Sequence, residues 1–205
     1  LPQPRRSEWN DLALYQTAQS PVAVDLSDNT SRFGVPPSAL AVLRETSAET
    51  VARYPSGYGE PLKEALAEYA GVGAAEIVTG CGSDDVLDSA IRAFGRPGET
   101  LSSLTPTFPM PARFARLNGL RLRESPLRAD GSFDPDALLE DSPAIVYLCS
   151  PNNPTGALLD VAAVDRVIAR ATGVVILDEA YVEFSGVSRV AQAPARGTLL
   201  VVRTM

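Results

Sequence analysis

Two short apolar runs, each followed by polar residues, constrain the fold of this chain most strongly. Residues 144–149 precede the segment Ser-Pro-Asn-Asn-Pro-Thr-Gly at 150–156, and residues 174–177 precede Asp-Glu-Ala-Tyr at 178–181. Both runs are too apolar for a strand with one face in solvent, so we predict two buried strands. Ligands of open α/β sheets bind outside the carboxyl ends of such strands, so the two polar endings predict one shared site.

Helical and strand patterns alternate along the chain, which predicts an α/β fold: a mostly parallel sheet with helices on both faces. We expect residues 1–35 to form an N-terminal arm and residues 36–205 to form one large domain. The expected helices span 36–54, 60–70, 83–94, 109–118, 135–140 and 160–171. The expected strands span 76–79, 100–104, 120–124, 144–149, 174–177 and 198–202.

Composition excludes several classes of function. The net charge of −7 argues against nucleic-acid binding, and the absence of an 18-residue apolar stretch makes a soluble cytoplasmic protein, without a membrane partner, the expectation. The chain has no histidine, which removes Ser-His-Asp triads and most zinc sites, so we predict no metal site. We expect Cys81 and Cys149, the only two cysteines, to be reduced thiols.

Lysine chemistry is also limited, because Lys63 is the only lysine. It lies off the apolar face of its predicted helix, so we expect a solvated surface residue and no covalent catalyst within the 205 residues. The chain begins at Leu1 and ends at Met205, directly after a strand-like run. We therefore expect it to be part of a longer polypeptide.

A glycine-rich segment, Gly-Cys-Gly-Ser-Asp-Asp at 80–85, joins an expected strand to a helix. Backbone N–H groups in the first helical turn can hold a phosphate. The same residues also suit plain helix capping, with Ser83 as N-cap and Asp84 and Asp85 favoured by the helix dipole. Both interpretations stay open on the residues alone.

Three further side chains are candidates for ligand contacts. Asp178 ends a buried strand, so its carboxylate needs a partner, either an arginine of the protein or a cation of a ligand. Tyr181 could place a hydroxyl beside the same ligand, and an Asn amide in the turn at 152–156 could donate to a ligand oxygen. Phe108, after the strand at 100–104, either stacks on a flat ligand or belongs to the core.

Together these segments resemble the fold-type-I pyridoxal-phosphate aminotransferases of class I/II, and most of all the histidinol-phosphate aminotransferases. The resemblance rests on a Gly-Ser-Asp helix start, Pro-Thr-Phe at 106–108, Asn-Asn-Pro-Thr-Gly at 152–156 and Asp-Glu-Ala-Tyr at 178–181. These motifs occur in the order of that family, and the similarity extends over residues 12–205. It implies pyridoxal 5'-phosphate as cofactor.

The resemblance also implies roles for individual residues. Backbone groups would hold the cofactor phosphate, Phe108 would stack on its ring, and Asp178 would pair with its protonated ring nitrogen. Tyr54 would reach the phosphate of a neighbouring subunit, which implies a homodimer with shared sites. Tyr15 and Asn29 would lie by the substrate. The remaining expected cofactor contacts are Gly82, Ser83, Asp84, Asn153 and Tyr181.

In this family a lysine forms a Schiff base with the cofactor, and the match of Arg203-Thr204-Met205 places it as the second residue after Met205. A smaller C-terminal domain would follow. The implied reaction moves an amino group between histidinol phosphate, or a related amino acid, and 2-oxoglutarate. After Asn29 the family usually has an acidic residue and a proline, whereas this chain has Thr-Ser-Arg at 30–32, which departs from the histidinol-phosphate pattern.

Three alternatives remain open. A threonine-phosphate-type decarboxylase shares these motifs and the cofactor. A non-catalytic effector-binding domain of a transcription regulator resembles aminotransferases without performing the reaction. A phosphate-binding α/β domain without pyridoxal chemistry is the simplest, and the joint presence of Asn153, Asp178 and Tyr181 argues against it.

Overall fold

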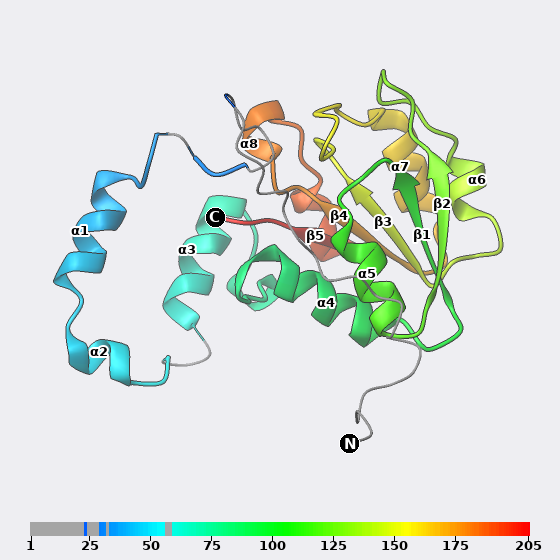
Figure 1. Ribbon diagram of the computed structural model, residues 1–205. Helices are drawn as coiled ribbons and strands as arrows, with labels where there is room; N and C mark the ends of the chain where they lie inside the picture. The colour runs from blue at the N-terminus through cyan, green and yellow to red at the C-terminus, as the bar shows by residue number, and fades with distance from the viewer. Residues whose placement is uncertain (1–22, 24–28, 32, 56–58) are drawn as a thin grey trace. The chain divides into compact units, whose positions relative to one another are not determined.

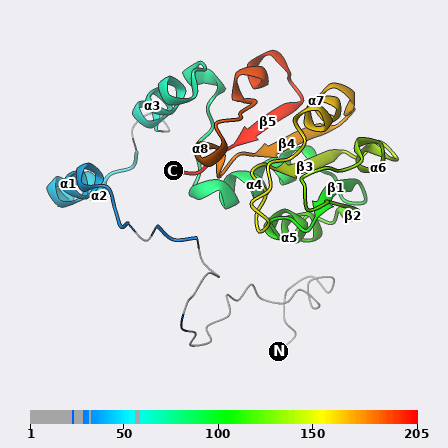
Figure 2. The same cartoon turned by 90° about the horizontal axis from the view of Figure 1, so that it is seen from above.

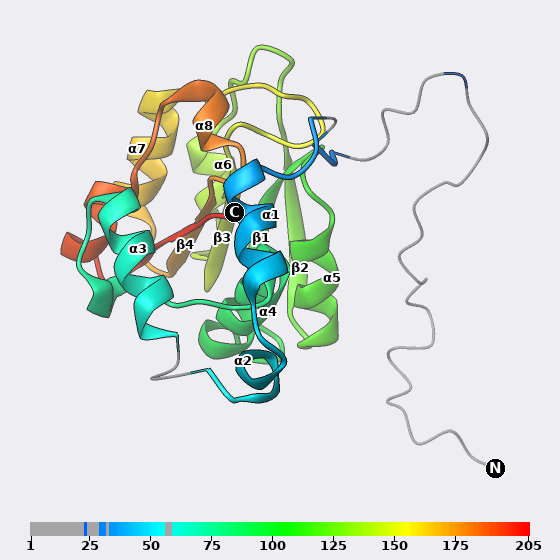
Figure 3. The same ribbon diagram turned by 90° about the vertical axis from the view of Figure 1, so that its left-hand side faces the viewer.

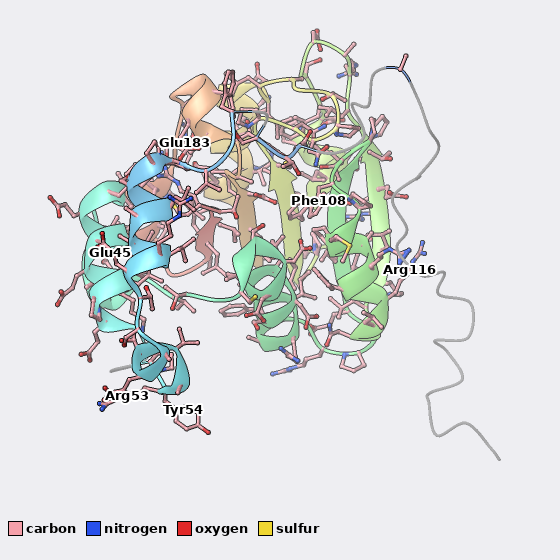
Figure 4. The ribbon with its side chains drawn as sticks, turned by 60° about the vertical axis from the view of Figure 1, so that its left-hand side comes forward. Glu45, Arg53, Tyr54, Phe108, Arg116 and Glu183 are labelled. Carbon is pink, nitrogen blue, oxygen red and sulfur yellow. The ribbon has the colours of Figure 1, made fainter. Side chains whose placement is uncertain are left out.

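The computed structural model describes residues 23, 29–31, 33–55 and 59–205. The chain folds as two units, residues 1–58 and residues 59–205. In the described part of the first unit, helix α1 (Pro37–Glu45) and helix α2 (Ala48–Ala52) follow one another, and neither contains a buried residue. Arg53 forms an ion pair with Glu49 at the end of α2 (Figure 4).

The prediction of one helix over 36–54 is wrong, because the chain leaves the helical conformation at Thr46 and Ser47. Both residues have extended backbone angles, and Ser47 caps α2 by accepting a 3.1 Å hydrogen bond from the Thr50 N–H. The Thr46 hydroxyl also donates to the Val42 carbonyl. Short hydroxyl side chains compete in this way with the helical hydrogen bonds, which ends one helix and begins the next.

The second unit is built on a five-stranded sheet in the order β2-β1-β3-β4-β5, and every pairing is parallel (Figure 1). The predicted parallel α/β fold is therefore confirmed. In the register of the central pair, Cys149 lies opposite Asp178, so the carboxyl ends of β3 and β4 are level. The strands are β1 (Thr100–Thr105), β2 (Arg121–Pro126), β3 (Ile145–Cys149), β4 (Val174–Asp178) and β5 (Leu199–Val202).

Helices cover both faces of this sheet (Figure 2). Helices α4 (Gly82–Phe94) and α5 (Met110–Leu117) lie side by side on one face (Figure 3) and bury Leu87, Ile91 and Ala115 against it. Helices α6 (Pro135–Leu139) and α7 (Val161–Arg170) cover the other face. The remaining elements are α3 (Glu60–Ala70), η3 (Ala74–Glu76), α8 (Val182–Ser185) and η4 (Val190–Ala195).

The strand predicted at 76–79 is wrong. Residues 74–76 form the short helix η3, and the segment that follows pairs with no strand of the described sheet. Its valine, Val78, is 79% exposed. An apolar residue pattern favours extended backbone, but a strand needs a neighbouring strand to satisfy its N–H and C=O groups.

None of the described helices is long and apolar enough to span a membrane.

Close backbone packing at the amino end of β4 gives a prediction about stability. A Cβ atom on Gly173 would lie 2.3 Å from the Ala144 carbonyl oxygen and 2.4 Å from that of Pro143. Because backbone cannot move aside cheaply, Gly173→Ala is expected to destabilise the fold by about 2 kcal/mol in urea unfolding. The control is Gly197→Ala, where a Cβ would meet no atom within 4 Å of the described structure. Equal stabilities of the two variants would contradict the prediction.

Candidate functional site

Most of the sequence-predicted site residues lie at the carboxyl ends of three adjacent strands and at one helix start. Phe108 follows β1 and Asn153 follows β3. Asp178 is the last residue of β4, and Tyr181 lies three residues after it. The first turn of α4 supplies Gly82, Ser83 and Asp84. Asp84 is close enough to Asp178 for its charge to act on that carboxyl group. The fold thus brings residues 82–84 to the carboxyl edge of the sheet.

Asp178 is 2% exposed and is held from two sides. Its Oδ2 accepts a 2.8 Å hydrogen bond from the Tyr147 hydroxyl, and its Oδ1 accepts a 3.0 Å bond from the Ala180 N–H. Burial raises the pKa of Asp178, and the Tyr147 hydrogen bond opposes that rise. No arginine or lysine in the described part of the chain forms an ion pair with Asp178. Of the two partners considered from the sequence, the arginine of the protein is therefore not found.

The two asparagines in the turn after β3 lie in different environments. Asn152 is 2% exposed; its amide donates to the Pro106 carbonyl and the Thr155 hydroxyl, and its Oδ1 accepts from the Thr107 hydroxyl. It therefore ties the loop after β1 to the loop after β3. Asn153 is only half-buried. Sequence reasoning selected Asn153 and missed Asn152, two of whose partners lie about 45 residues away along the chain.

The start of α4 does not have the helix cap that was considered from the sequence. The helix begins at Gly82 with Cys81 as N-cap, and no side chain caps it, so the interpretation of Ser83 as N-cap is wrong. Gly82 has a φ of +76°, which favours glycine. The Asp85 carboxylate turns back and accepts a 2.9 Å bond from the Cys81 N–H. The N–H groups of the first helical turn have no acceptor within the helix.

Two aromatic residues border the same edge. Phe108 lies between β1 and α5 (Figure 4), is half-buried, and packs against the apolar cluster beneath α4 and α5. Its side chain is thus anchored in the core and still partly open. Tyr181 is the N-cap of α8, is half-buried, and lies with its ring centre 6.5 Å from that of Phe184.

A buried glutamate beside Asp178 is a feature that sequence reasoning missed. Glu179 is 1% exposed and accepts from both Nη2 (2.9 Å) and Nε (3.2 Å) of Arg203. It also accepts from the Ser188 hydroxyl at 2.8 Å and the Arg189 N–H at 2.6 Å. The arginine at the end of β5 therefore pairs with Glu179 and not with Asp178. The Asp-Glu pair in the sequence is the only local signal of this arrangement.

The other predicted residues belong to the first unit or lie outside the described residues. Tyr54 follows α2 and is 98% exposed (Figure 4), and Asn29 precedes α1. Both belong to the unit 1–58. Tyr15 lies outside the described residues. Lys63 is half-buried within α3, so the expectation of a solvated surface lysine is met only in part.

The two cysteines are expected to differ sharply in reactivity. Cys81 is exposed, whereas Cys149 is buried and burial raises its pKa to about 12. Because the thiolate is the nucleophile, iodoacetamide at pH 8 should label Cys81 in the native protein and Cys149 only after unfolding. Peptide mapping of the alkylated sites checks this, with a guanidinium-unfolded sample as the control. Rapid labelling of Cys149 in the native protein would contradict the described burial.

Comparison with known proteins places this site in a family. The model of the family "Aminotransferase class I and II" matches residues 21–205. The histidinol-phosphate aminotransferase of Desulfitobacterium hafniense is 37% identical over 97% of this chain, and the chain covers 58% of that relative. The chain thus spans little more than half the length of the curated relatives that it matches.

Solved structures give the same result. The histidinol-phosphate aminotransferase of Sinorhizobium meliloti, solved in complex with pyridoxal-5'-phosphate, superposes with a TM-score of 0.73 and 29% identity; the match covers 86% of this chain and 50% of that one. An L-threonine-O-3-phosphate decarboxylase from Porphyromonas gingivalis reaches a TM-score of 0.63 and 25% identity over 74% of this chain and 48% of its own. The family match, the parallel sheet and the motifs at its carboxyl edge agree: the chain belongs to the class I and II aminotransferases.

Proposed function

We propose that this chain forms the cofactor-binding part of a pyridoxal-phosphate-dependent aminotransferase. The enzyme would move an amino group between histidinol phosphate, or a related amino acid, and 2-oxoglutarate. The observation that carries the proposal is Asp178, a buried carboxylate at the end of a central strand without a cation of its own among the described residues. A buried carboxylate of this kind suits a ligand that brings the cation.

The residues present fit the ring of such a cofactor. Each carboxylate oxygen of Asp178 accepts one hydrogen bond from the protein. Each can still accept a further hydrogen bond, such as one from a protonated ring nitrogen. Phe108 and Asn153 are both half-buried at the same edge, which suits an aromatic ring face and an amide donor toward a ring oxygen. Tyr181, three residues after Asp178, offers its hydroxyl as a second donor to that oxygen.

The start of α4 fits a phosphate. The helix has 13 residues, so its dipole and free N–H groups favour an anion at the N-terminus. Asp85 directs its carboxylate back to the Cys81 N–H, which leaves the N–H groups of Ser83 and Asp84 as the donors for the anion.

When bound, pyridoxal phosphate supplies an electron sink for the carbon that loses its proton. The chain's own residues prepare that chemistry. An ionised Asp178 would keep a proton on the ring nitrogen, Phe108 would hold the plane of the ring, and the first turn of α4 would anchor the phosphate. The proton-shuttling lysine would be the second residue after Met205, beyond the end of β5.

We further propose a homodimer in which Tyr54 reaches the phosphate of the neighbouring subunit, with Tyr15 and Asn29 beside the substrate. Residues 1–35 would form the arm that covers the substrate, and residues 36–205 would belong to the large domain. The exposure of Tyr54 within its own unit supports a contact with another group. Size-exclusion chromatography with light scattering tests the assembly, and a monomeric active enzyme would contradict it.

The test of the proposed reaction uses the full-length protein with pyridoxal phosphate. Borohydride reduction followed by peptide mass mapping should find one cofactor adduct just beyond Met205. Product analysis with histidinol phosphate and 2-oxoglutarate should then show glutamate. Release of carbon dioxide from a phosphorylated amino acid would instead favour the decarboxylase, to which the Porphyromonas gingivalis structure is similar. Cofactor binding without turnover of any amino acid would favour the effector-binding alternative.

A further inference from the structure

The hydrogen bond between Tyr147 and Asp178 carries an inference that rests on the proposed function and deepens it. Tyr147 is in the middle of β3, is fully buried, and places its hydroxyl 2.8 Å from Oδ2 of Asp178. Tyr147 pairs in register with Ile176, two residues before Asp178 and on the same face of β4. The sheet itself therefore aims this hydroxyl at the carboxylate.

We propose that Tyr147 is a positioning residue of the cofactor site, whose buried hydroxyl keeps Asp178 ionised and oriented toward the ligand cation. The Ala180 N–H holds the other oxygen at 3.0 Å, so the carboxylate plane is fixed from both sides before any ligand binds. A preorganised carboxylate loses no orientational freedom when the ring nitrogen arrives.

The charges around Asp178 explain why this donor matters. The groups that face it are Asp84 from α4, Cys149 from β3 and Glu179 from its own strand end. Asp84 and Glu179 both disfavour a further negative charge, and burial acts in the same direction. Against these stand two donors, the Tyr147 hydroxyl and the Ala180 N–H. Removing one of the two donors therefore shifts Asp178 toward its neutral form.

Tyr147 is suited to this role because it cannot lose its own proton near neutral pH. Burial and the neighbouring carboxylate raise the pKa of Tyr147 well above its usual range. Burial likewise keeps the Cys149 thiol protonated, and its Sγ donates to the Pro151 carbonyl at 3.4 Å. Of the three titratable side chains in this cluster, Tyr147 and Cys149 thus both keep their protons, and Asp178 accepts the hydrogen bond from the Tyr147 hydroxyl.

The test compares Tyr147→Phe with Ser102→Ala in the full-length protein. Ser102 is a matched control because it is also fully buried in the sheet and its hydroxyl donates a 2.8 Å bond to the Leu138 carbonyl, toward α6 on the other face. Urea unfolding of the cofactor-free protein is measured between pH 5 and pH 8. The stability lost in Tyr147→Phe should grow with pH, because the missing bond stabilises the ionised carboxylate, whereas the loss in Ser102→Ala should stay constant.

Cofactor binding supplies the second measurement. The dissociation constant of pyridoxal phosphate should rise about tenfold at pH 7 in Tyr147→Phe, the effect of losing one hydrogen bond to a charged group, and stay unchanged in Ser102→Ala. A loss of stability that is the same at every pH, with unchanged cofactor affinity, would overturn the inference and leave Tyr147 a structural residue.

These results separate the inference from the proposed function. If Asp178→Asn weakens cofactor binding and Tyr147→Phe does not, the inference fails while the function stands. If the wild-type protein binds no pyridoxal phosphate, the proposed function fails. In that case the pH-dependent stability of the cofactor-free protein still decides whether Tyr147 holds Asp178 ionised.

Discussion

Replacing Asp178 by asparagine is expected to lower the rate of amino-group transfer by on the order of 10²–10³-fold and to weaken cofactor binding. The amide keeps the size of the side chain and can still accept from the Tyr147 hydroxyl, so the fold should be preserved. It carries no negative charge, however, and cannot hold a proton on the ring nitrogen of the cofactor. Steady-state rates and cofactor titration of the full-length variant check the prediction.

The same substitution gives a pH-dependent signature in the cofactor-free protein. Burial raises the pKa of Asp178 above its usual value of 3.8, so the folded chain keeps this proton to higher pH than the unfolded chain. Stability therefore falls as pH rises from that value through the raised pKa of the folded state. Asp178→Asn removes this fall.

The control for Asp178→Asn is Asp136→Asn, which removes an exposed carboxylate on α6. It should leave both the transfer rate and the contribution of Asp178 to the pH profile unchanged. Normal turnover by Asp178→Asn would contradict the role proposed for this carboxylate and would revive a phosphate-binding domain without pyridoxal chemistry.

Replacing Arg203 by methionine is expected to destabilise the protein by about 3 kcal/mol. Arg203 is mostly buried and gives two hydrogen bonds to Glu179, which is 1% exposed. Methionine fills much of the space but leaves the buried charge with only the Ser188 hydroxyl and the Arg189 N–H. Urea unfolding at pH 7 measures the loss.

Arg170→Met is the matched control, because Arg170 pairs with Asp136 where both side chains are more than half exposed. Exposed ion pairs contribute about 1 kcal/mol or less, so this variant should be nearly as stable as the wild type. The double variant Arg203→Met with Glu179→Gln should recover part of the lost stability, since it removes the unpaired charge. Equal effects of the two single arginine variants would show that the Glu179–Arg203 pair is not the source of the loss.

Candidate site residues could be predicted from the sequence where they lie at the end of an apolar strand or in the turn directly after it. Asp178 stands directly after one apolar run and Asn153 lies in the turn after the other, and those runs identify the strand ends without knowledge of the rest of the fold. Their partners were not predictable in the same way. Tyr147 lies 31 residues before Asp178, and nothing in its local sequence distinguishes a hydroxyl that donates to a carboxylate from an ordinary core tyrosine.

Local patterns also failed where the outcome depended on a neighbour. Residues 76–79 have a strand-like pattern, but they pair with no strand of the described sheet. The apolar run at 145–149 forms β3 because it pairs with β1 on one side and β4 on the other. The break between α1 and α2 was different, because Ser47 and Thr50 mark it locally as a helix start.

The sequence by itself therefore determined the parallel α/β fold, the edge of the sheet at which the candidate site is proposed, and the family. The fold and the sheet edge follow from periodicity and from residues that are adjacent in the chain, whereas the family follows from the resemblance of the motifs to known sequences. Only the tertiary structure decided that Asp178 receives the Tyr147 hydroxyl, that Arg203 pairs with Glu179, and that Asn152 joins two loops. Buried polar groups must find partners wherever the packed fold presents them, and strand register, not sequence neighbourhood, decides which groups meet.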